Sequence, residues 1–307
     1  MTKKRYWVNV RRSMPLVIMT LPGLAYLLIN NYIPMAGLVI AFKDFNYAKG
    51  IFGSDWAGLK NFEFLFRTRD AFVITRNTVL YNATFIIINT VVAIATAIML
   101  SEVTKKAMMR IYQTVILLPY LISIVIVSYL VYAFLSVNVG FINKTLLPLF
   151  GKEGISWYTE AKYWPFILPI VSLWRGFGFY SVVYLSSIVG IDRTYYEAAE
   201  LDGATKFQCI QHITLPLITP VITMMALLAV GRIFYSDFGL FYQVPMNSGT
   251  LYSTTNVIDT YVYRGLMQLG DIGMSAAAGL YQSLVGFLLV LGSNLLVRKV
   301  NPDNALF

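Results

Sequence analysis

Six apolar runs, each long enough to cross a lipid bilayer, divide this chain of 307 residues. They cover residues 14–42, 78–100, 111–135, 163–188, 217–235 and 272–297. A membrane-spanning helix needs about 17 to 25 predominantly apolar residues, and a helix satisfies within itself the backbone hydrogen bonds that lipid cannot provide. The sequence therefore predicts an all-α, polytopic membrane protein with six transmembrane helices.

The composition argues against a soluble protein. Charged residues make up 13% of the chain and hydrophobic residues 57%, whereas soluble domains contain about 25% charged residues. The net charge of +9 does not predict nucleic-acid binding, because the basic residues lie at the ends of the runs and in loops rather than on one face of a folded domain.

The residues that usually carry catalysis are missing or isolated. Cys209 and His212 are the only cysteine and histidine, so the chain contains no disulfide framework and no clustered Cys/His metal site. The phosphate-binding pattern G-x-x-x-x-G-K-[ST] is also missing, since residues 203–206 (GATK) lack its upstream glycine. We expect neither a catalytic residue nor a metal site, and no cofactor bound by this chain.

The distribution of Lys and Arg predicts the orientation. Residues 1–13 contain five of them, and the short segments that would share their side of the membrane bring the total to 12, against 10 in longer loops on the other side. Such residues are enriched in cytoplasmic segments, so both termini are expected in the cytoplasm. The domain organisation that follows is a cytoplasmic tail (1–13), a six-helix domain (14–300) that includes a cytoplasmic loop at 191–216, and a C-terminal tail (301–307).

The loop at 191–216 is unusually acidic for the cytoplasmic side. Glu197 begins a strongly helix-forming stretch, with Thr194 three residues earlier as its expected cap and Gly203 at its end. Residues 206–213 can form a second short helix before Pro216 turns the chain into the fifth span. Two interpretations remain open: a docking element for a basic partner, or a solvated loop helix, which the physical arguments alone favour.

The spacing of this loop resembles a known signature. The pattern E-A-A, three residues, G, nine residues, I-x-L-P is that of binding-protein-dependent ABC importer permeases, and the residues that match it are Glu197, Ala198, Ala199, Gly203, Ile213, Leu215 and Pro216. In that family the segment is a coupling helix that docks on a separate ATPase. The resemblance implies the type I ABC importer (MetI-like) fold, and it assigns coupling to the ATPase to these residues together with Asp202.

Residues 31–66 resemble the first span and outer loop of carbohydrate permeases of the maltose-transporter type, in the LplB branch. The resemblance implies a non-catalytic permease for oligosaccharide uptake in a bacterial cell membrane. Its implied partners are a second homologous permease in a heterodimer, two copies of an ATPase that uses ATP and Mg, an extracytoplasmic sugar-binding protein and membrane lipid. The alternatives are an ABC permease for another solute, a self-sufficient carrier or channel, and a membrane scaffold.

Arg175 lies near the middle of the fourth run, where a charge costs at least about 2.5–3.5 kcal/mol. It should therefore face protein or water. With its aromatic neighbours Trp174, Phe179 and Tyr180, it either lines a sugar pathway or pairs with a carboxylate of a companion subunit or with backbone carbonyls. Both interpretations stay open.

Two more polar groups lie in the spans. Asn82, Asn89 and Thr96 recur every seven residues and share a helical face; they line a polar cavity or, as we favour, tie helices together. Arg232, Tyr235 and Asp237 mark either an outer entrance or a local ion pair. The candidate pathway residues are Asn82, Asn89, Trp174, Arg175, Phe179, Tyr180, Arg232 and Tyr235.

Overall fold

The computed structural model describes residues 3–300 and residue 302. The described part is helical, with one antiparallel pairing of two short strands, β1 (Lys43–Asp44) and β2 (Asp55–Trp56). The chain forms two compact units. The first comprises Met1–Leu65 with Gly265–Leu280, and the second comprises Phe66–Arg264 with Tyr281–Phe307.

The first unit is dominated by one long helix. α1 (Lys3–Leu27) continues through a π-helical turn (Leu28–Tyr32), α2 (Ile33–Met35) and a 3-10 helix (Ala36–Phe42). Its apolar side chains are largely exposed, as expected for a helix that is covered by lipid. A short helix, α3 (Gly50–Gly53), lies between the two strands, and another, α4 (Glu63–Arg67), follows β2.

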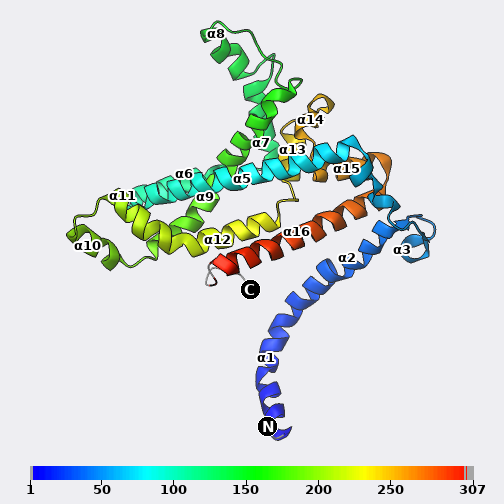
Figure 1. Cartoon of the computed structure of the whole chain (residues 1–307), viewed down its shortest axis with the longest axis horizontal. Helices are drawn as coiled ribbons and strands as arrows, with labels where there is room; N and C mark the ends of the chain where they lie inside the picture. The colour runs from blue at the N-terminus through cyan, green and yellow to red at the C-terminus, as the bar shows by residue number, and fades with distance from the viewer. Residues whose placement is uncertain (1–2, 301, 303–307) are drawn as a thin grey trace. The chain divides into compact units, whose positions relative to one another are not determined.

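The second unit contains a bundle of long helices, shown in Figure 1. Its members are α5 (Arg69–Ser101), α6 (Lys106–Leu121), α7 (Ile124–Leu135), α9 (Trp164–Val189), α12 (Leu215–Gly231) and α16 (Ile272–Val300), which begins in the first unit. α9 packs along α5 and α6, and α12 packs against both α5 and α9. Small buried residues such as Ala93 and Ala97 let these helices approach closely.

Short elements connect the long helices. They are α8 (Leu147–Leu149), α10 (Arg193–Leu201), α11 (Lys206–Cys209), α13 (Phe238–Gln243), α14 (Tyr252–Thr255) and α15 (Ile258–Leu269). Figure 1 shows α10 and α11 at one end of the bundle and α13 and α14 towards the other.

The predicted third span is wrong as a single helix. Five described helices are long and apolar enough to cross a membrane, and the sixth span requires α6 and α7 to be counted together, although they meet at 93°. Ile122 and Ser123 between them have extended backbone, through which a helix cannot continue. Val127 of α7 is buried in a cluster with α13, so tertiary packing holds α7 out of line with α6.

The predicted limits of the fifth span were also wrong. The continuous helix runs over Lys206–Gly231, so it starts within the polar loop and ends before residues 232–235. Hydropathy did not predict the first, polar part of this helix, because a helix can extend beyond the hydrocarbon core into water, where its residues need not be apolar.

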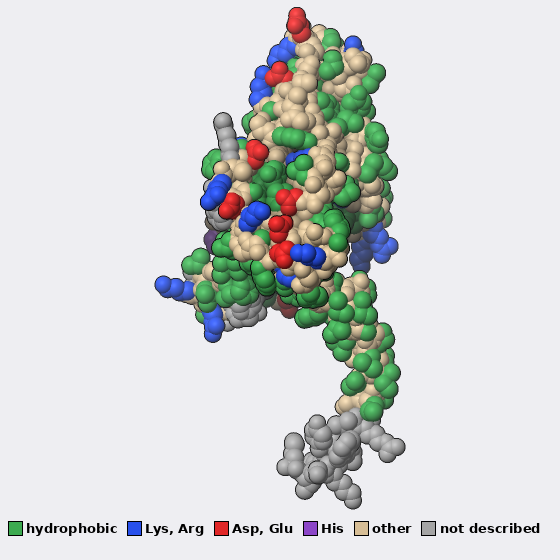
Figure 2. Space-filling view, turned by 90° about the vertical axis from the view of Figure 1, so that its right-hand side faces the viewer, with side chains coloured by type: hydrophobic (Ala, Val, Ile, Leu, Met, Phe, Trp, Pro, Cys, Tyr) green, Lys and Arg blue, Asp and Glu red, His purple; other side chains and the backbone are tan. Residues whose placement is uncertain are grey.

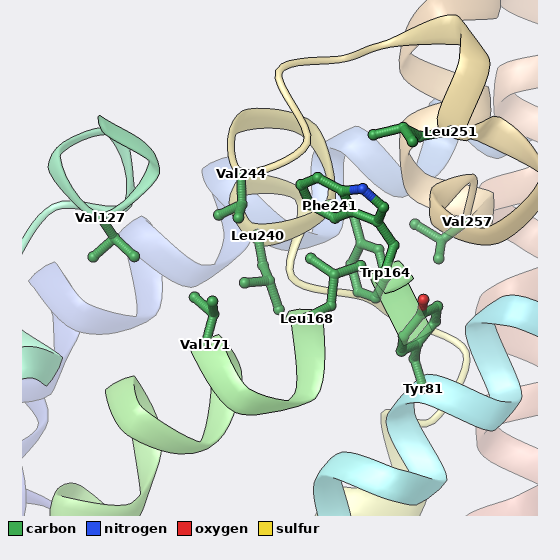
Figure 3. Packing of buried hydrophobic residues seen from close by; sticks show 10 residues of the cluster. All are labelled: Tyr81, Val127, Trp164, Leu168, Val171, Leu240, Phe241, Val244, Leu251 and Val257. Carbon is green, nitrogen blue, oxygen red and sulfur yellow. The ribbon is translucent and has the colours of Figure 1, made fainter. Parts of the chain in front are cut away.

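A cluster of buried side chains joins α5, α7, the beginning of α9, α13 and the chain on either side of α14, as Figure 3 shows. Trp164 is fully buried at its centre, and its indole Nε1 donates a hydrogen bond to the Trp157 carbonyl oxygen at 2.7 Å. Tyr81 and Phe241 meet edge to face, with ring centroids 5.0 Å apart. This cluster positions the chain that follows α12.

Hydrophobic side chains also cover much of the molecular surface, as Figure 2 shows for one face. Leu80, Ile87 and Val91 of α5, for example, are all exposed. Soluble monomers rarely expose such large contiguous apolar areas. The surface therefore agrees with the membrane environment that the composition predicts.

Candidate functional site

Two hollows of nearly equal size lie in the second unit. We call the first, of about 460 Å³, the arginine cavity; it is lined mainly by α5, α9, α12 and the segment after α12. We call the second, of about 470 Å³, the acidic hollow; it lies between the end of α5, the end of α9 and the α10–α11 segment. Both volumes are within the range of about 300–1,000 Å³ that is usual for small-molecule sites.

An ion pair spans the arginine cavity. Nη1 of Arg175 lies 2.9 Å from Oδ2 of Asp237, and Oδ1 of Asp237 accepts the Leu240 N–H at 3.0 Å, which caps α13. One interpretation predicted that Arg175 pairs with a carboxylate of a companion subunit. The carboxylate is instead that of Asp237, in the same chain. Arg175 both pairs and lines the cavity, so the two interpretations of this residue are compatible.

Arg232 and Tyr235 also line this cavity, and they lie in the segment after the end of α12. The backbone of this segment is held by Asn82, whose Nδ2 donates to the Ile233 carbonyl oxygen at 2.8 Å. The Tyr235 hydroxyl lies 2.7 Å from Oγ of Ser283 on α16. Asn82 therefore joins α5 to this wall and lines the cavity as well.

The rest of the polar stripe on α5 divides. Asn89 donates from Nδ2 to the Phe85 carbonyl oxygen of its own helix, while its Oδ1 is buried without a hydrogen-bond partner in the described structure. Thr96 bonds back to Val92 and does not line the cavity. The favoured interpretation was that all three residues tie helices together by hydrogen bonds. Of the three, only Asn82 forms a hydrogen bond to another segment.

The aromatic candidates also divide. Tyr180 lines the arginine cavity, whereas Trp174 and Phe179 are not among its lining residues. Phe179 instead stacks on Tyr120 of α6, with ring centroids 4.7 Å apart. Sequence reasoning missed Tyr120 and Tyr184, which do line the cavity.

One signal could have found part of the missed wall. Ser172, Gly176, Tyr180 and Tyr184 all line the cavity and follow one another at four-residue intervals on α9. Residues with this spacing share a helical face. Extending that face by one step from Tyr180 would have identified Tyr184, but nothing in the sequence pointed to Tyr120.

Gly178 explains how α6 forms part of the wall. A Cβ atom at this position would lie 1.9 Å from the Ile116 carbonyl oxygen, which is far inside van der Waals contact. The glycine therefore allows the backbones of α6 and α9 to touch. The structure therefore shows close helix packing at this glycine.

The α10 helix beside the acidic hollow is capped differently from the prediction. Its N-cap is Asp192, whose Oδ1 accepts the Thr194 N–H at 3.0 Å. This hydrogen bond lowers the pKa of the Asp192 carboxyl below its ordinary value. Thr194 is the donor rather than the cap, because the N-cap lies two residues earlier than the capping-box pattern placed it.

Gly203 makes the turn between α10 and α11. Its φ of +80° is left-handed, and the Gly203 and Ala204 N–H groups donate to the carbonyls of Glu200 and Ala199. This pattern is the Schellman motif, which ends helices at glycine. Thr205 and Gln208 then form a capping box that starts α11.

The predicted turn at Pro216 is wrong. α11 passes through a π-helical stretch (Ile210–Thr214) directly into α12, so residues 206–213 are not a separate helix. Pro216 occupies the first turn of α12, and the π-helical bonding before it accommodates the missing proline N–H. Residues 206–214 are thus a continuous extension of the membrane helix α12.

Two side-chain contacts attach this segment to the bundle. The Tyr196 hydroxyl lies 2.9 Å from Oγ1 of Thr214, which is only 3% exposed. Lys206 pairs with Glu102 at the end of α5. Glu197 is exposed and has no hydrogen bond or ion pair with the described residues.

The remaining motif residues follow from this geometry. Ala198 and Asp202 are exposed, Ala199 is half-buried, and Ile213 and Leu215 are half-buried where the helix enters the bundle. Beyond them, the apolar side chain of Leu201 is 90% exposed at the end of α10. In the described part of the chain, no group of three or more His, Cys, Asp or Glu side chains is arranged to hold a metal ion.

Comparison with known proteins agrees with this picture. Residues 73–302 match the family described as "binding-protein-dependent transport system inner membrane component". The polygalacturonan/rhamnogalacturonan transport system permease protein YteP of Bacillus subtilis is 34% identical over 98% of this chain and 93% of its own length. Protein LplB of the same organism is 33% identical over 96% of this chain and 92% of its own length.

Solved structures extend the likeness to the fold. A subunit of a bacterial ABC transporter involved in the import of the acidic polysaccharide alginate superimposes with a TM-score of 0.87, at 33% identity, over 97% of this chain and 99% of that one. The same type of transporter in complex with an alginate pentasaccharide-bound periplasmic protein gives a TM-score of 0.86 at 32% identity, over 96% of this chain and 98% of that one.

Proposed function

This chain belongs to the family of binding-protein-dependent transport system inner membrane components, and we propose that it carries oligosaccharides through its arginine cavity while a separate ATPase drives it through the α10–α11 segment. The family comprises non-catalytic, multi-pass inner-membrane permeases of ABC importers, whose complexes include an ATPase and a periplasmic substrate-binding protein. ATP is therefore hydrolysed outside this chain.

The exposed α10–α11 segment is the observation that supports coupling most directly. It presents Glu197 without a partner and Leu201 almost fully exposed, and it is continuous with α12 through Thr214. A docking surface needs unpaired charge and uncovered apolar area. Movement of a bound ATPase at this segment would be transmitted to α12, which lines the arginine cavity through Met225 and Ala229.

A carbohydrate substrate is supported by the relatives and by the cavity. The matched proteins are described as transporting polygalacturonan or rhamnogalacturonan and alginate. The arginine cavity combines the aromatic rings of Tyr120 and Tyr180 with the polar groups of Asn82 and Ser172. Aromatic faces stack on sugar rings, and polar side chains hydrogen-bond sugar hydroxyls.

The complete transporter would contain a second, homologous permease, two ATPase subunits and a sugar-binding protein on the outer face. Both termini, and with them α10 and α11, would face the cytoplasm. The five basic residues in 1–13, together with Arg298 and Lys299 in the last turn of α16, support this orientation.

Charge reversal at Glu197 tests the coupling. Purified complexes of Glu197→Lys should retain less ATPase subunit and lose most sugar uptake, because the positive charge would repel a basic docking partner. The measurements are the ATPase-to-permease ratio after purification and uptake into proteoliposomes. Glu153→Lys, a matched change at another exposed glutamate, should leave both unchanged.

Normal uptake by Glu197→Lys would refute the coupling role. If the wild-type chain took up sugar in proteoliposomes without any ATPase, a self-sufficient carrier would be the correct function instead. Retention of an ATPase with uptake of a non-sugar solute alone would leave the coupling standing and refute the carbohydrate assignment.

A further inference from the structure

The arginine cavity contains more positive charge than its own residues neutralise. Its charged lining residues are Arg175, Arg232 and Asp237, and Asp237 already pairs with Arg175. Within the described residues, no side chain forms a hydrogen bond or ion pair with Arg232. With two arginines against one aspartate, the cavity carries a net charge of +1.

The fold explains how Arg232 is tolerated without a partner. It is the C-cap of α12, and its backbone N–H contacts the carbonyl oxygens of Ala229 and Val230. A cation at a helix C-terminus gains about 0.3–1 kcal/mol from the helix dipole. This effect stabilises the charge without neutralising it, so the guanidinium remains available to a ligand.

Arg175 leaves a second donor edge unused. Only its Nη1 contacts Asp237, and its Nε is without a hydrogen-bond partner in the described structure. Guanidinium groups bind carboxylates most strongly through two parallel N–H donors. The Nε atom is buried, and neither oxygen of Asp237 accepts a hydrogen bond from it. Asp237 therefore satisfies the Arg175 guanidinium only in part.

A neutral sugar would need the rings and hydroxyls of this cavity but not its excess charge. When a ligand displaces water, an unpaired guanidinium loses hydration that a neutral ligand restores only in part. A carboxylate on the ligand would restore it through charge-assisted hydrogen bonds, which are worth about 1.5–3 kcal/mol each. The lining therefore favours an anionic ligand over a neutral one of the same size.

We propose that the arginine cavity selects acidic oligosaccharides, whose uronate carboxylates pair with Arg232. The inference rests on the proposed function, in which a carbohydrate passes through this cavity. The carbohydrate would be negatively charged, and Arg232 would be the residue that recognises its charge.

Two probes of equal length separate charge from size: trigalacturonate, and its fully methyl-esterified form, which is neutral. Their binding would be measured by calorimetry on the complete transporter in nanodiscs, without the binding protein, so that only the membrane part contributes. We expect the acid to bind at least about tenfold more tightly than the ester. Arg232→Met should remove about tenfold of that preference, or about 1.4 kcal/mol.

Arg298→Met is the matched control, because Arg298 is exposed in the last turn of α16 and does not line the cavity. It should keep the full preference, and Arg232→Lys should keep part of it. Equal affinity of the wild type for acid and ester, an unchanged preference in Arg232→Met, or no binding of either probe would overturn the proposal.

Failure of the proposed function would look different. If neutral oligosaccharides are taken up as well as acidic ones, the charge selectivity is wrong and the carbohydrate permease remains. If neither class stimulates ATP hydrolysis by the complex with its binding protein, the carbohydrate function itself is wrong.

Discussion

The arginine cavity and the acidic hollow differ in charge rather than in size. The first, about 460 Å³, is lined by two arginines and one aspartate. The second, about 470 Å³, is lined by Glu102, Glu197 and Glu200 with Arg193 and Lys206, and so carries a net charge of −1. Among the described residues, the first hollow leaves Arg232 without an ion pair, and the second leaves both Glu197 and Glu200 without one.

The difference follows from where each hollow lies along the helices. Arg175 is in the middle of a spanning helix, where an unpaired charge is costly, and it pairs with Asp237 within the chain. Glu197 is on an exposed helix beyond the spans, where water can hydrate it. The interior therefore uses its acid to stabilise the fold, whereas the loop leaves its acid free for a partner.

The largest effect is expected from removing a wall of the arginine cavity. In Gly178→Leu, even the Cβ atom would lie only 1.9 Å from the Ile116 carbonyl oxygen. The substitution should therefore push α6 away from α9 and lower the free energy of unfolding by about 3 kcal/mol or more. Thermal unfolding of the purified complex measures it. Gly292→Ala, where a Cβ meets no atom within 4 Å, should instead stabilise by about 0.5–1 kcal/mol.

Removing the internal acid should have the next largest effect. Asp237→Asn breaks the pair with Arg175 but can still cap α13; because Asp237 is 46% exposed, we expect a loss of about 1–2 kcal/mol rather than the about 3–5 kcal/mol of a fully buried pair.

Asp237→Ala should cost about 1 kcal/mol more, since the cap is lost as well. Both losses would be measured by thermal unfolding. Asp55→Asn, which breaks an exposed pair with Lys49, should change nothing measurable. An equal loss from the two Asp237 variants would show that the cap contributes little.

A smaller effect is expected where the acidic hollow meets the membrane helix. Tyr196→Phe removes the hydroxyl that contacts Thr214, a hydrogen bond worth about 1 kcal/mol. Sugar uptake per ATP hydrolysed should fall about fivefold, while the ATPase remains bound. Tyr195→Phe, at the exposed neighbouring tyrosine, should have no effect, and loss of the ATPase from Tyr196→Phe would indicate a docking rather than a transmitting role.

The smallest effect concerns pH and has opposite signs in the two regions. Burial raises the pKa of Asp259, which accepts the N–H of the cavity residue Ser236. Asp259 therefore contributes stability that is complete below its unfolded pKa of about 3.9 and is lost as pH rises through the raised folded pKa. Asp192 has a lowered pKa, so its contribution is present above about pH 4 and is lost as pH falls further.

Thermal unfolding across the acidic range would separate the two contributions. Asn resembles the neutral form of Asp, so both variants should differ from the wild type mainly at neutral pH, where the wild-type carboxyls are charged. Asp259→Asn should raise stability there because it removes a charge that burial disfavours, whereas Asp192→Asn should lower it because it removes a charge that the Thr194 N–H stabilises. Profiles that run parallel to the wild type in both variants would show that neither carboxyl titrates differently in the folded protein.

Much of the α10–α11 segment could be predicted because its signals are local. The helix-forming acids, the left-handed glycine at 203 and the spacing to Pro216 are all written within twenty residues. The predicted turn at Pro216 was wrong, because a π-helical stretch joins α11 to α12. No local sequence signal distinguishes such a stretch from a turn before proline.

The arginine cavity could be predicted only in pieces. Arg175 and Asp237 were both recognised as unusual, but they are 62 residues apart, and only the packing of α9 against α13 brings them to 2.9 Å. Tyr120 was missed because it lies at the end of α6, where the chain bends by 93°.

By itself, the sequence determined the membrane environment, the helical architecture and the family, since each depends on run lengths and short-range spacing along the chain. Only the tertiary structure decided which polar side chains share a cavity, which acid neutralises Arg175 and which arginine stays unpaired. Those outcomes depend on contacts between helices that are distant in sequence, and hydropathy carries no information about how such helices face one another.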